Sequence, residues 1–202
     1  MTERPLTQRG LERRRQLIDC AVELFATRGY DPTSVSDIVD AVGVGKGVFY
    51  WYFDGKEALL REILVDALQQ LRRHQREVIG DEPDPLRRIE LGIRATLSWR
   101  LENRALVTIT QFAAGEGRFA STLREVHGVA VNDIVQHVKD AIVEGQVRDE
   151  DPVVLGHALV GVTTHLASLL GDDHGPDAAE VAAVAVRFCL AGLRSDTEMY
   201  DS

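Results

Sequence analysis

Residues 43–53, with the sequence GVGKGVFYWYF, decide the fold. The glycines at positions 43, 45 and 47 alternate as they do in phosphate-binding loops. A Walker loop, however, needs Gly at position 40 and Ser or Thr at position 47, where the chain has Asp40 and Gly47. A dinucleotide-binding fingerprint needs Gly at position 48 and a preceding strand, but Val48 follows a helical pattern. Both phosphate-loop interpretations are therefore excluded.

The same residues make physical sense as the beginning of a short recognition helix. The first turn of a helix offers free backbone N–H groups and the positive end of the helix dipole; Lys46 adds charge and Gly47 lets DNA approach the backbone. Three successive aromatic residues, at 50–52, cannot all face one core at about 100° per residue. We expect Phe49 and Phe53 inside and at least two of the other three outside, where their donors can reach phosphate oxygens.

Upstream of this helix, two further helices are predicted. Apolar residues recur at three- and four-residue spacing from Leu11 until Gly29 ends the pattern. Ser34 can cap a short second helix, with Asp37 in the reciprocal position of a capping box. Gly43 ends that helix, and two short helices joined by a tight glycine turn form the helix-turn-helix pattern.

Downstream, the chain continues as helix after helix, and strand patterns are scarce. A long helix is predicted from Lys56 to about Ile79, where two prolines break the pattern. The later helices are predicted at about 85–102, 104–113, 118–144, 152–170 and 176–195. The predicted fold class is all-α with about nine helices: an N-terminal three-helix helix-turn-helix DNA-binding domain (1–55) and a larger helical domain (56–202).

Charge is distributed unevenly along the chain. The 202 residues carry 23 Lys and Arg against 32 Asp and Glu, a formal net charge of −9 that on its own argues against nucleic acid as a partner. Residues 1–56, however, contain eight basic and eight acidic residues, so the rest of the chain carries the whole of the −9. The acidic part is therefore expected to face away from DNA.

Residues 10–60 resemble the DNA-binding region of the tetracycline-repressor (TetR) family of transcriptional regulators. The matching stretches are residues 18–29, 33–38 (TSVSDI), 41–44 (AVGV), 46–53 (KGVFYWYF) and 56–60 (KEALL). The remaining 140 or so residues resemble the family only in their helical layout.

The resemblance implies DNA contacts from the second and third helices and from the start of the fourth. The residues are Ser34, Ser36, Gly45, Lys46, Gly47, Val48, Tyr50, Trp51, Tyr52 and Lys56. Gly45 and Gly55 depart from the family pattern, which more often has a capping Ser, Thr or Asn at these positions. Backbone N–H groups and the two lysines therefore carry more of the predicted contact. The arginines at 4, 9, 13, 14 and 15 are predicted to reach phosphates or the minor groove, and for Arg4 and Arg9 a solvated terminus is the alternative.

The last two predicted helices are apolar on all sides, whereas a surface helix of a small monomer has a polar stripe. Burial on two sides, against the chain's own domain and against a second subunit, resolves this, and the resemblance implies a two-fold homodimer through a four-helix bundle. The predicted interface residues are Leu155, Leu159, Val162, Leu166, Leu169, Val184 and Phe188.

The resemblance also implies an effector pocket among the fourth to eighth helices. Its candidate residues are Leu64, Leu68, Trp99, Ile109, Phe112, Val126, Val129 and His165, each of which is equally compatible with ordinary core. Their composition favours a hydrophobic or amphipathic effector.

Other classes of protein have little support. Zinc-protease, serine-hydrolase and paired-cysteine motifs are absent from the sequence, so an enzyme, a cofactor and a metal site are not expected. The acidic cluster beside His174 lies in a Gly/Pro turn typical of a solvated loop. No stretch approaches 18 apolar residues, which predicts a cytoplasmic protein without a membrane partner.

The sequence thus predicts a ligand-responsive regulator, with a repressor favoured, that releases a palindromic operator when its effector binds. The alternative is a helical small-molecule-binding protein that no longer binds DNA. Salt-dependent binding to a palindrome upstream of the chain's own gene separates the two.

Overall fold

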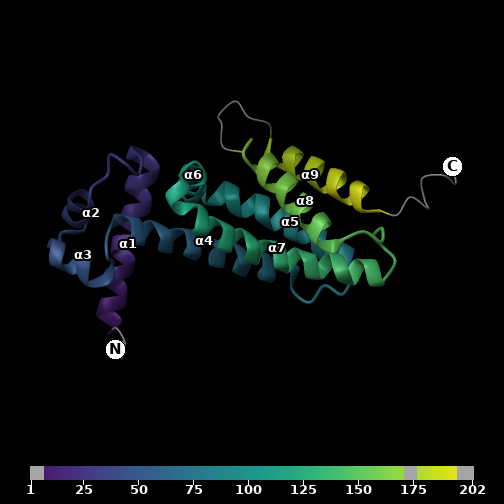
Figure 1. Ribbon diagram of the computed structural model, residues 1–202, viewed down its shortest axis with the longest axis horizontal. Helices are drawn as coiled ribbons and strands as arrows, with labels where there is room; N and C mark the ends of the chain where they lie inside the picture. The colour runs from purple at the N-terminus through teal and green to yellow at the C-terminus, as the bar shows by residue number, and fades with distance from the viewer. Residues whose placement is uncertain (1–6, 171–176, 195–202) are drawn as a thin grey trace. The chain divides into compact units, whose positions relative to one another are not determined.

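A computed structural model describes residues 7–170 and 177–194, and over these ranges the chain is helical with short connections and no strand (Figure 1). The α-helices are α1 (Gln8–Arg28), α2 (Val35–Val42), α3 (Lys46–Tyr52), α4 (Lys56–Ile79), α5 (Pro85–Glu102), α6 (Arg104–Ala114), α7 (Ala120–Val143), α8 (Pro152–Ala167) and α9 (Ala178–Leu193), with a 3-10 turn, η1, at Gly117–Phe119. The predicted all-α class is confirmed. Arg4 and the acidic turn beside His174 lie outside the described residues.

The described residues form two compact units. The N-terminal unit comprises the chain up to Ala67 together with residues 105–123; the C-terminal unit comprises residues 68–104 and the chain from Arg124 onward. These units do not follow the predicted division at residues 55/56, because Leu59, Leu60 and Ile63 belong to the core of the N-terminal unit. Where DNA recognition ends along the chain stays a prediction.

The core of the N-terminal unit is built from residues far apart in sequence. Leu17 and Phe25 of α1 pack with Phe49 of α3 and with the buried face of α4, and Phe119 of η1 completes the same cluster. Phe49, Leu17 and Phe119 are each fully buried. The short helices α2 and α3 are thereby held by a core larger than either could build alone.

The C-terminal unit has its own core of α5, α7, α8 and α9, centred on residues such as Ile89, Val138, Leu159 and Ala185. The helices α7 and α8 approach closely at Gly156, where an added Cβ would lie 2.6 Å from a methyl group of Val135. None of the described helices is both long enough and apolar enough to span a lipid bilayer.

Candidate nucleic-acid interface

Both ends of α2 are fixed by local hydrogen bonds. The Ser34 hydroxyl accepts from the Asp37 N–H at 3.2 Å, and the Asp37 carboxylate accepts from the Ser34 N–H at 2.7 Å, which is the predicted capping box. The Ser34 hydroxyl also donates to the Asp37 carboxylate, and this bond, followed by the one from the Ser34 N–H, holds the pKa of the Asp37 carboxyl below its usual value. Gly43 ends α2 with φ of +72°, a left-handed conformation that favours glycine, and Val44 donates back to the Val39 carbonyl at 2.9 Å.

The aromatic residues of α3 divide as the sequence predicts. Phe49 is fully buried and Phe53 is 4% exposed, whereas Tyr50 and Trp51 are 56% and 66% exposed. Tyr52 is half-buried, with its ring edge-on to that of Trp51 at 4.6 Å. One face of α3 therefore anchors the helix while the other presents aromatic donors to solvent.

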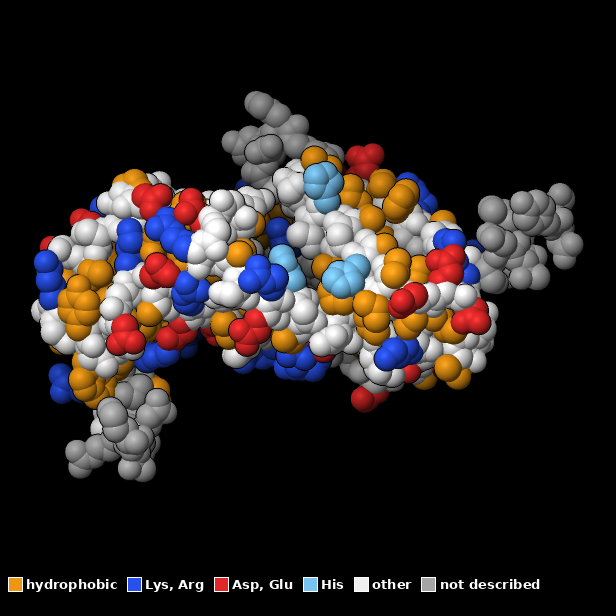
Figure 2. Space-filling view, viewed as in Figure 1, with side chains coloured by type: hydrophobic (Ala, Val, Ile, Leu, Met, Phe, Trp, Pro, Cys, Tyr) orange, Lys and Arg blue, Asp and Glu red, His pale blue; other side chains and the backbone are white. Residues whose placement is uncertain are grey.

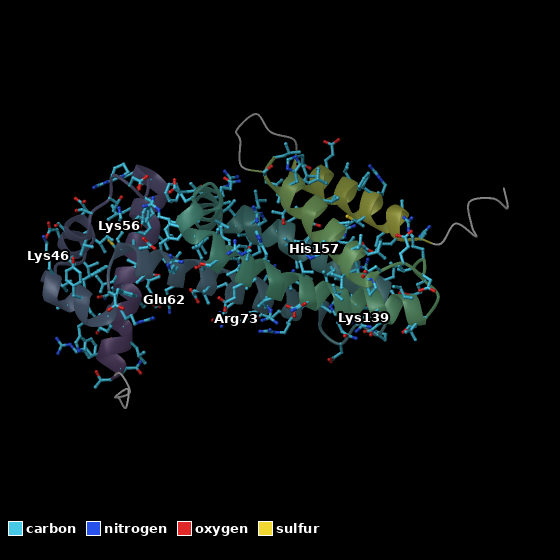
Figure 3. The ribbon with its side chains drawn as sticks, in the orientation of Figure 1. Lys46, Lys56, Glu62, Arg73, Lys139 and His157 are labelled. Carbon is cyan, nitrogen blue, oxygen red and sulfur yellow. The ribbon has the colours of Figure 1, made fainter. Side chains whose placement is uncertain are left out.

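The first turn of α3 is open. Gly45, Lys46 and Gly47 are exposed, and a Cβ added at either glycine would meet nothing within 4 Å. Val48 is half-buried, and Lys46 lies at the surface beside α2 and α3 (Figure 3). On α2, Ser34 is exposed and Ser36 is half-buried. Most of the predicted DNA-binding residues thus share the surface of the helix-turn-helix.

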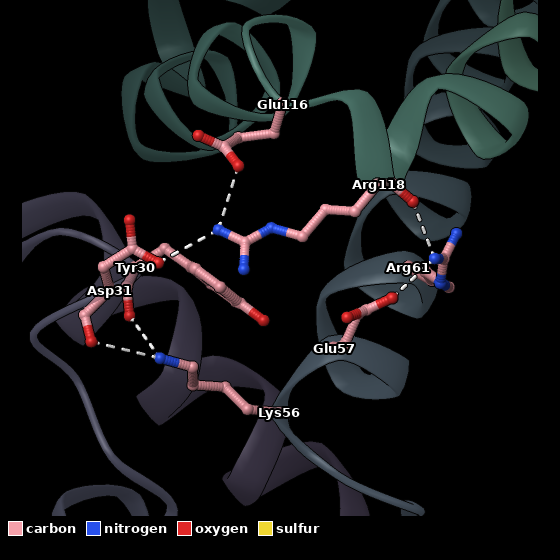
Figure 4. A network of polar contacts seen from close by, with 7 residues as sticks. All are labelled: Tyr30, Asp31, Lys56, Glu57, Arg61, Glu116 and Arg118. Carbon is pink, nitrogen blue, oxygen red and sulfur yellow. Dashed lines mark hydrogen bonds and ion pairs between the residues drawn. The ribbon is translucent and has the colours of Figure 1, made fainter.

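Lys56 is placed differently from the other predicted contacts. Its ammonium donates to the carbonyl oxygens of Tyr30 at 2.7 Å and Asp31 at 3.3 Å (Figure 4). It also donates to the Thr33 carbonyl at 2.8 Å and lies 4.1 Å from the centre of the Tyr30 ring. Partial burial lowers the pKa of this ammonium. Because an ammonium has three donors, a phosphate contact would have to replace one of these bonds.

Arg14 is likewise engaged within the protein. Its guanidinium pairs with Glu62 of α4 and lies 5.4 Å from the centre of the Phe53 ring. Arg9 and Arg15 are exposed, and Arg15 lies 3.7 Å from the Asp19 carboxylate. Of the described N-terminal arginines, Arg9 is therefore freer to meet a phosphate than Arg14.

A polar cluster that no motif indicated joins η1 to the loop between α1 and α2. Arg118 pairs with Asp31 and with Glu116, each at 3.0 Å, and its guanidinium lies 5.1 Å from the centre of the Tyr30 ring (Figure 4). Arg61 of α4 donates to the Arg118 carbonyl at 2.7 Å. The loop that leads into α2 is thus held from two sides, by α4 and by η1.

The predicted pocket residues fall in both compact units. Leu64, Ile109 and Phe112 belong to the core cluster of the N-terminal unit. In the C-terminal unit, Trp99 is 8% exposed, and Leu68, Val126 and Val129 are half-buried. His165 is exposed on α8, contrary to the inward orientation expected from the sequence. Their role in binding a ligand stays a prediction.

The predicted dimer residues divide between core and surface. Leu155 and Leu159 are buried in the core of their own unit, and Val162 and Leu166 are partly buried against it. Leu169, Val184 and Phe188 are 46%, 39% and 64% exposed. Figure 2 shows hydrophobic side chains at the surface over α8 and α9.

These exposed residues continue along both helices, and we call the set the α8–α9 face. It comprises Val154, Ala158, Gly161, His165 and Leu169 along α8 and its end, with Val184, Phe188 and Ala191 on α9. Both runs have the three- to four-residue spacing of one helical face.

The helix-turn-helix region is similar in sequence to known bacterial regulators. A sequence model described as "Bacterial regulatory proteins, tetR family" matches residues 17–63. The transcriptional repressor KstR2 of Rhodococcus jostii is 43% identical over 72 residues, a match that spans 36% of this chain and 35% of the relative.

Similarity also extends over nearly the whole chain. KstR2 of Mycobacterium tuberculosis is 27% identical over 189 residues, covering 91% of this chain and 94% of the relative. The solved structure of the fatty acid degradation regulator FadR from Bacillus halodurans superposes with a TM-score of 0.81 at 20% identity, over 90% of this chain and 96% of that one.

Proposed function

The chain belongs to the TetR family of bacterial transcriptional regulators, and we propose that it is a homodimeric repressor whose two α3 helices read a palindromic operator. Each α3 would enter one major groove, with half-sites one or more helical turns apart. Such a protein acts on DNA in the bacterial cytoplasm.

The observation that carries this proposal is the exposure of Tyr50 and Trp51 beside Lys46. Phe49 and Phe53 already anchor α3 to the core, so the two exposed rings are not needed for packing within the unit. A phenol, an indole N–H and an ammonium on one short helix are donors suited to phosphate oxygens.

The test is operator binding as a function of salt. The purified chain is titrated onto DNA from the region upstream of its own gene, between about 50 and 200 mM salt, where phosphate contacts strongly affect affinity. We expect a palindromic site in a DNase footprint, and we expect Lys46→Gln to reduce the salt slope by about one. The absence of salt-dependent, sequence-specific binding would instead favour the alternative, a helical small-molecule-binding protein that no longer binds DNA.

We further propose that the α8–α9 face forms the dimer interface. An apolar face with Phe188 at 64% exposure is unfavourable in water, and a two-fold axis would bury it against its own copy. In sedimentation, the wild type should run as a dimer and Phe188→Asp as the 22.4 kDa monomer. Val143→Asp is the control, because Val143 is 87% exposed at the end of α7, outside this face. A dimer that survives Phe188→Asp would contradict this interface.

The effector is proposed to be an amphipathic small molecule. Of the relatives named above, FadR is a regulator of fatty acid degradation, and KstR2 of Mycobacterium tuberculosis is a ketosteroid transcriptional regulator. Binding would favour a dimer geometry whose recognition helices no longer match the operator, and the shift is limited by the effector's difference in affinity for the two states. Ligand titration against a preformed operator complex measures this difference directly.

A further inference from the structure

Arg100 is a shielded cation near the end of α5. It follows Ile93 and Leu97 by seven and three residues, and both of these are only 2% exposed, so Arg100 begins on the buried side of the helix. Its Nε atom is inaccessible to solvent and lacks a hydrogen-bond partner. Among the described residues, none forms a hydrogen bond or an ion pair with its guanidinium.

Several other arginines of the C-terminal unit are paired with carboxylates. Arg72 donates two hydrogen bonds to the Asp133 carboxylate, at 2.5 and 2.9 Å. Arg88 pairs with Asp140 at 3.2 Å, and Arg94 pairs with Glu90 at 2.8 Å. Burial lowers the pKa of the Arg100 guanidinium, and no carboxylate opposes that effect. Among the described residues, Arg100 thus lacks the counter-charge that the half-buried Arg72 and Arg88 have.

An unpaired buried charge has a large desolvation cost, so buried arginines are almost always paired. The half-buried guanidinium of Arg100 would be stabilised by an anion, and the described residues do not supply one. Arginine is also the side chain best suited to hold a carboxylate or phosphate, because its planar fork makes two parallel hydrogen bonds.

Contacts within the C-terminal unit show which part of α7 lies level with the end of α5. The helices α4 and α5 run antiparallel, since Gln75 contacts Thr96 and His74 contacts Ser98. Arg72, a little further back on α4, reaches Asp133 of α7. The end of α5 therefore lies level with the part of α7 around residues 128–133.

That part of α7 contains half-buried Val129, and Trp99 directly precedes Arg100. A ligand whose anionic group met Arg100 would find apolar side chains within a helical turn.

We propose that Arg100 binds the anionic group of the effector, a carboxylate or a phosphate carried on an apolar body. This inference rests on the proposed ligand-responsive function and narrows its effector from amphipathic molecules to amphipathic anions. Two chemical forms can supply the anion: a free carboxylic acid, or the phosphates of an acyl thioester of coenzyme A.

The experiment compares matched probes on the full-length protein. Dodecanoate, its uncharged methyl ester and dodecanoyl-coenzyme A are titrated by calorimetry onto the wild type, Arg100→Gln and the control Arg94→Gln, whose side chain lies exposed on the same helix and pairs with Glu90. A second variant, Arg100→Lys, keeps the charge but loses the fork. Thermal unfolding shows that each variant is folded.

We expect the wild type to bind an anionic probe at least about ten-fold more tightly than the ester, the difference typical of a charge-assisted hydrogen bond. Arg100→Gln should lose that preference, Arg94→Gln should keep it, and Arg100→Lys should fall between them. Tighter binding of dodecanoate or of the thioester identifies the form of the anion.

The proposal is overturned if the wild type binds ester and anions equally, if neither anionic probe binds, or if Arg100→Gln keeps the preference. The wild-type comparison of ester with anion needs no variant, so a misfolded variant does not remove the test. Operator binding by the wild type without any probe is measured in parallel. If the wild type does not bind the operator, the proposed regulatory function itself is refuted. If it binds the operator but the probe experiment fails, only the role of Arg100 is refuted.

Discussion

Replacing Lys56 by Met tests whether the ammonium of this lysine stabilises the fold or contacts DNA phosphates. The substitution keeps an unbranched apolar stem and removes the ammonium that donates to three loop carbonyls. Two of those bonds, to Tyr30 and Thr33, are partly buried, and the third is exposed. Hydrogen bonds to charged groups contribute about 1.5–3 kcal/mol each, but water can reach the freed carbonyls, so we expect a loss of about 2 kcal/mol.

That loss corresponds to a fall in Tm of about 4–8 °C for a chain of this size. The assay pairs thermal unfolding, followed by circular dichroism, with operator binding at several salt concentrations. Lys46→Met is the matched control, because Lys46 is exposed at the start of α3. It should leave Tm unchanged and lower the salt slope by about 0.9.

For Lys56→Met we expect the reverse: a lower Tm and an unchanged salt slope. If Lys56→Met instead kept the wild-type Tm and reduced the slope by about one, its ammonium would contact phosphate and the three-carbonyl argument would be refuted.

Three further changes test other parts of the fold. Ser34→Ala removes the capping box of α2 and should destabilise the chain by about 1 kcal/mol in urea unfolding, and an unchanged midpoint would show that the cap contributes nothing. Burial is the main reason that the pKa of His137 lies below its ordinary value, so below about pH 6.5 the unfolded chain binds more protons than the folded one. The free energy of unfolding should therefore fall as the pH is lowered from about 7 to 5. His137→Gln should make this dependence on pH shallower, and a variant whose dependence runs parallel to that of the wild type would contradict the role of His137. Gly156→Ala places a Cβ 2.6 Å from a Val135 methyl and should lower the free energy of unfolding by about 1–3 kcal/mol. The control Gly128→Ala, whose Cβ would meet nothing within 4 Å, should leave stability unchanged or raise it. Equal unfolding midpoints for the two variants would contradict the close approach of α7 and α8.

The local features of the helix-turn-helix could be predicted from the sequence because each depends on a few neighbouring residues. The capping box at Ser34, the left-handed turn at Gly43 and the division of the α3 aromatics follow from spacing and from the conformational needs of single residues. Local rules of this kind do not require knowledge of the partner helices.

The side-chain partners of charged residues could not be predicted in this way. Lys56 and Arg118 both converge on the loop at Tyr30 and Asp31, although Arg118 is 87 positions from Asp31 in the chain. Which arginine lacks a partner, as Arg100 does, depends on the packing of several helices at once. In the same way, an all-apolar pattern could not distinguish buried Leu155 from exposed Phe188.

The core of the N-terminal unit has a consequence for protein engineering. A chimeric regulator joins the DNA-binding domain of one protein to the ligand-binding domain of another, and the end of the third helix is an obvious junction. Here a graft cut after residue 55 would leave behind the α4 leucines and Phe119, which close the apolar core around Phe49. A chimera that transfers the chain up to residue 67 together with residues 105–123 would carry that core intact. The unit suited to exchange is therefore discontinuous in sequence, and the receiving ligand-binding domain must accept an internal segment as well as the N-terminal fusion.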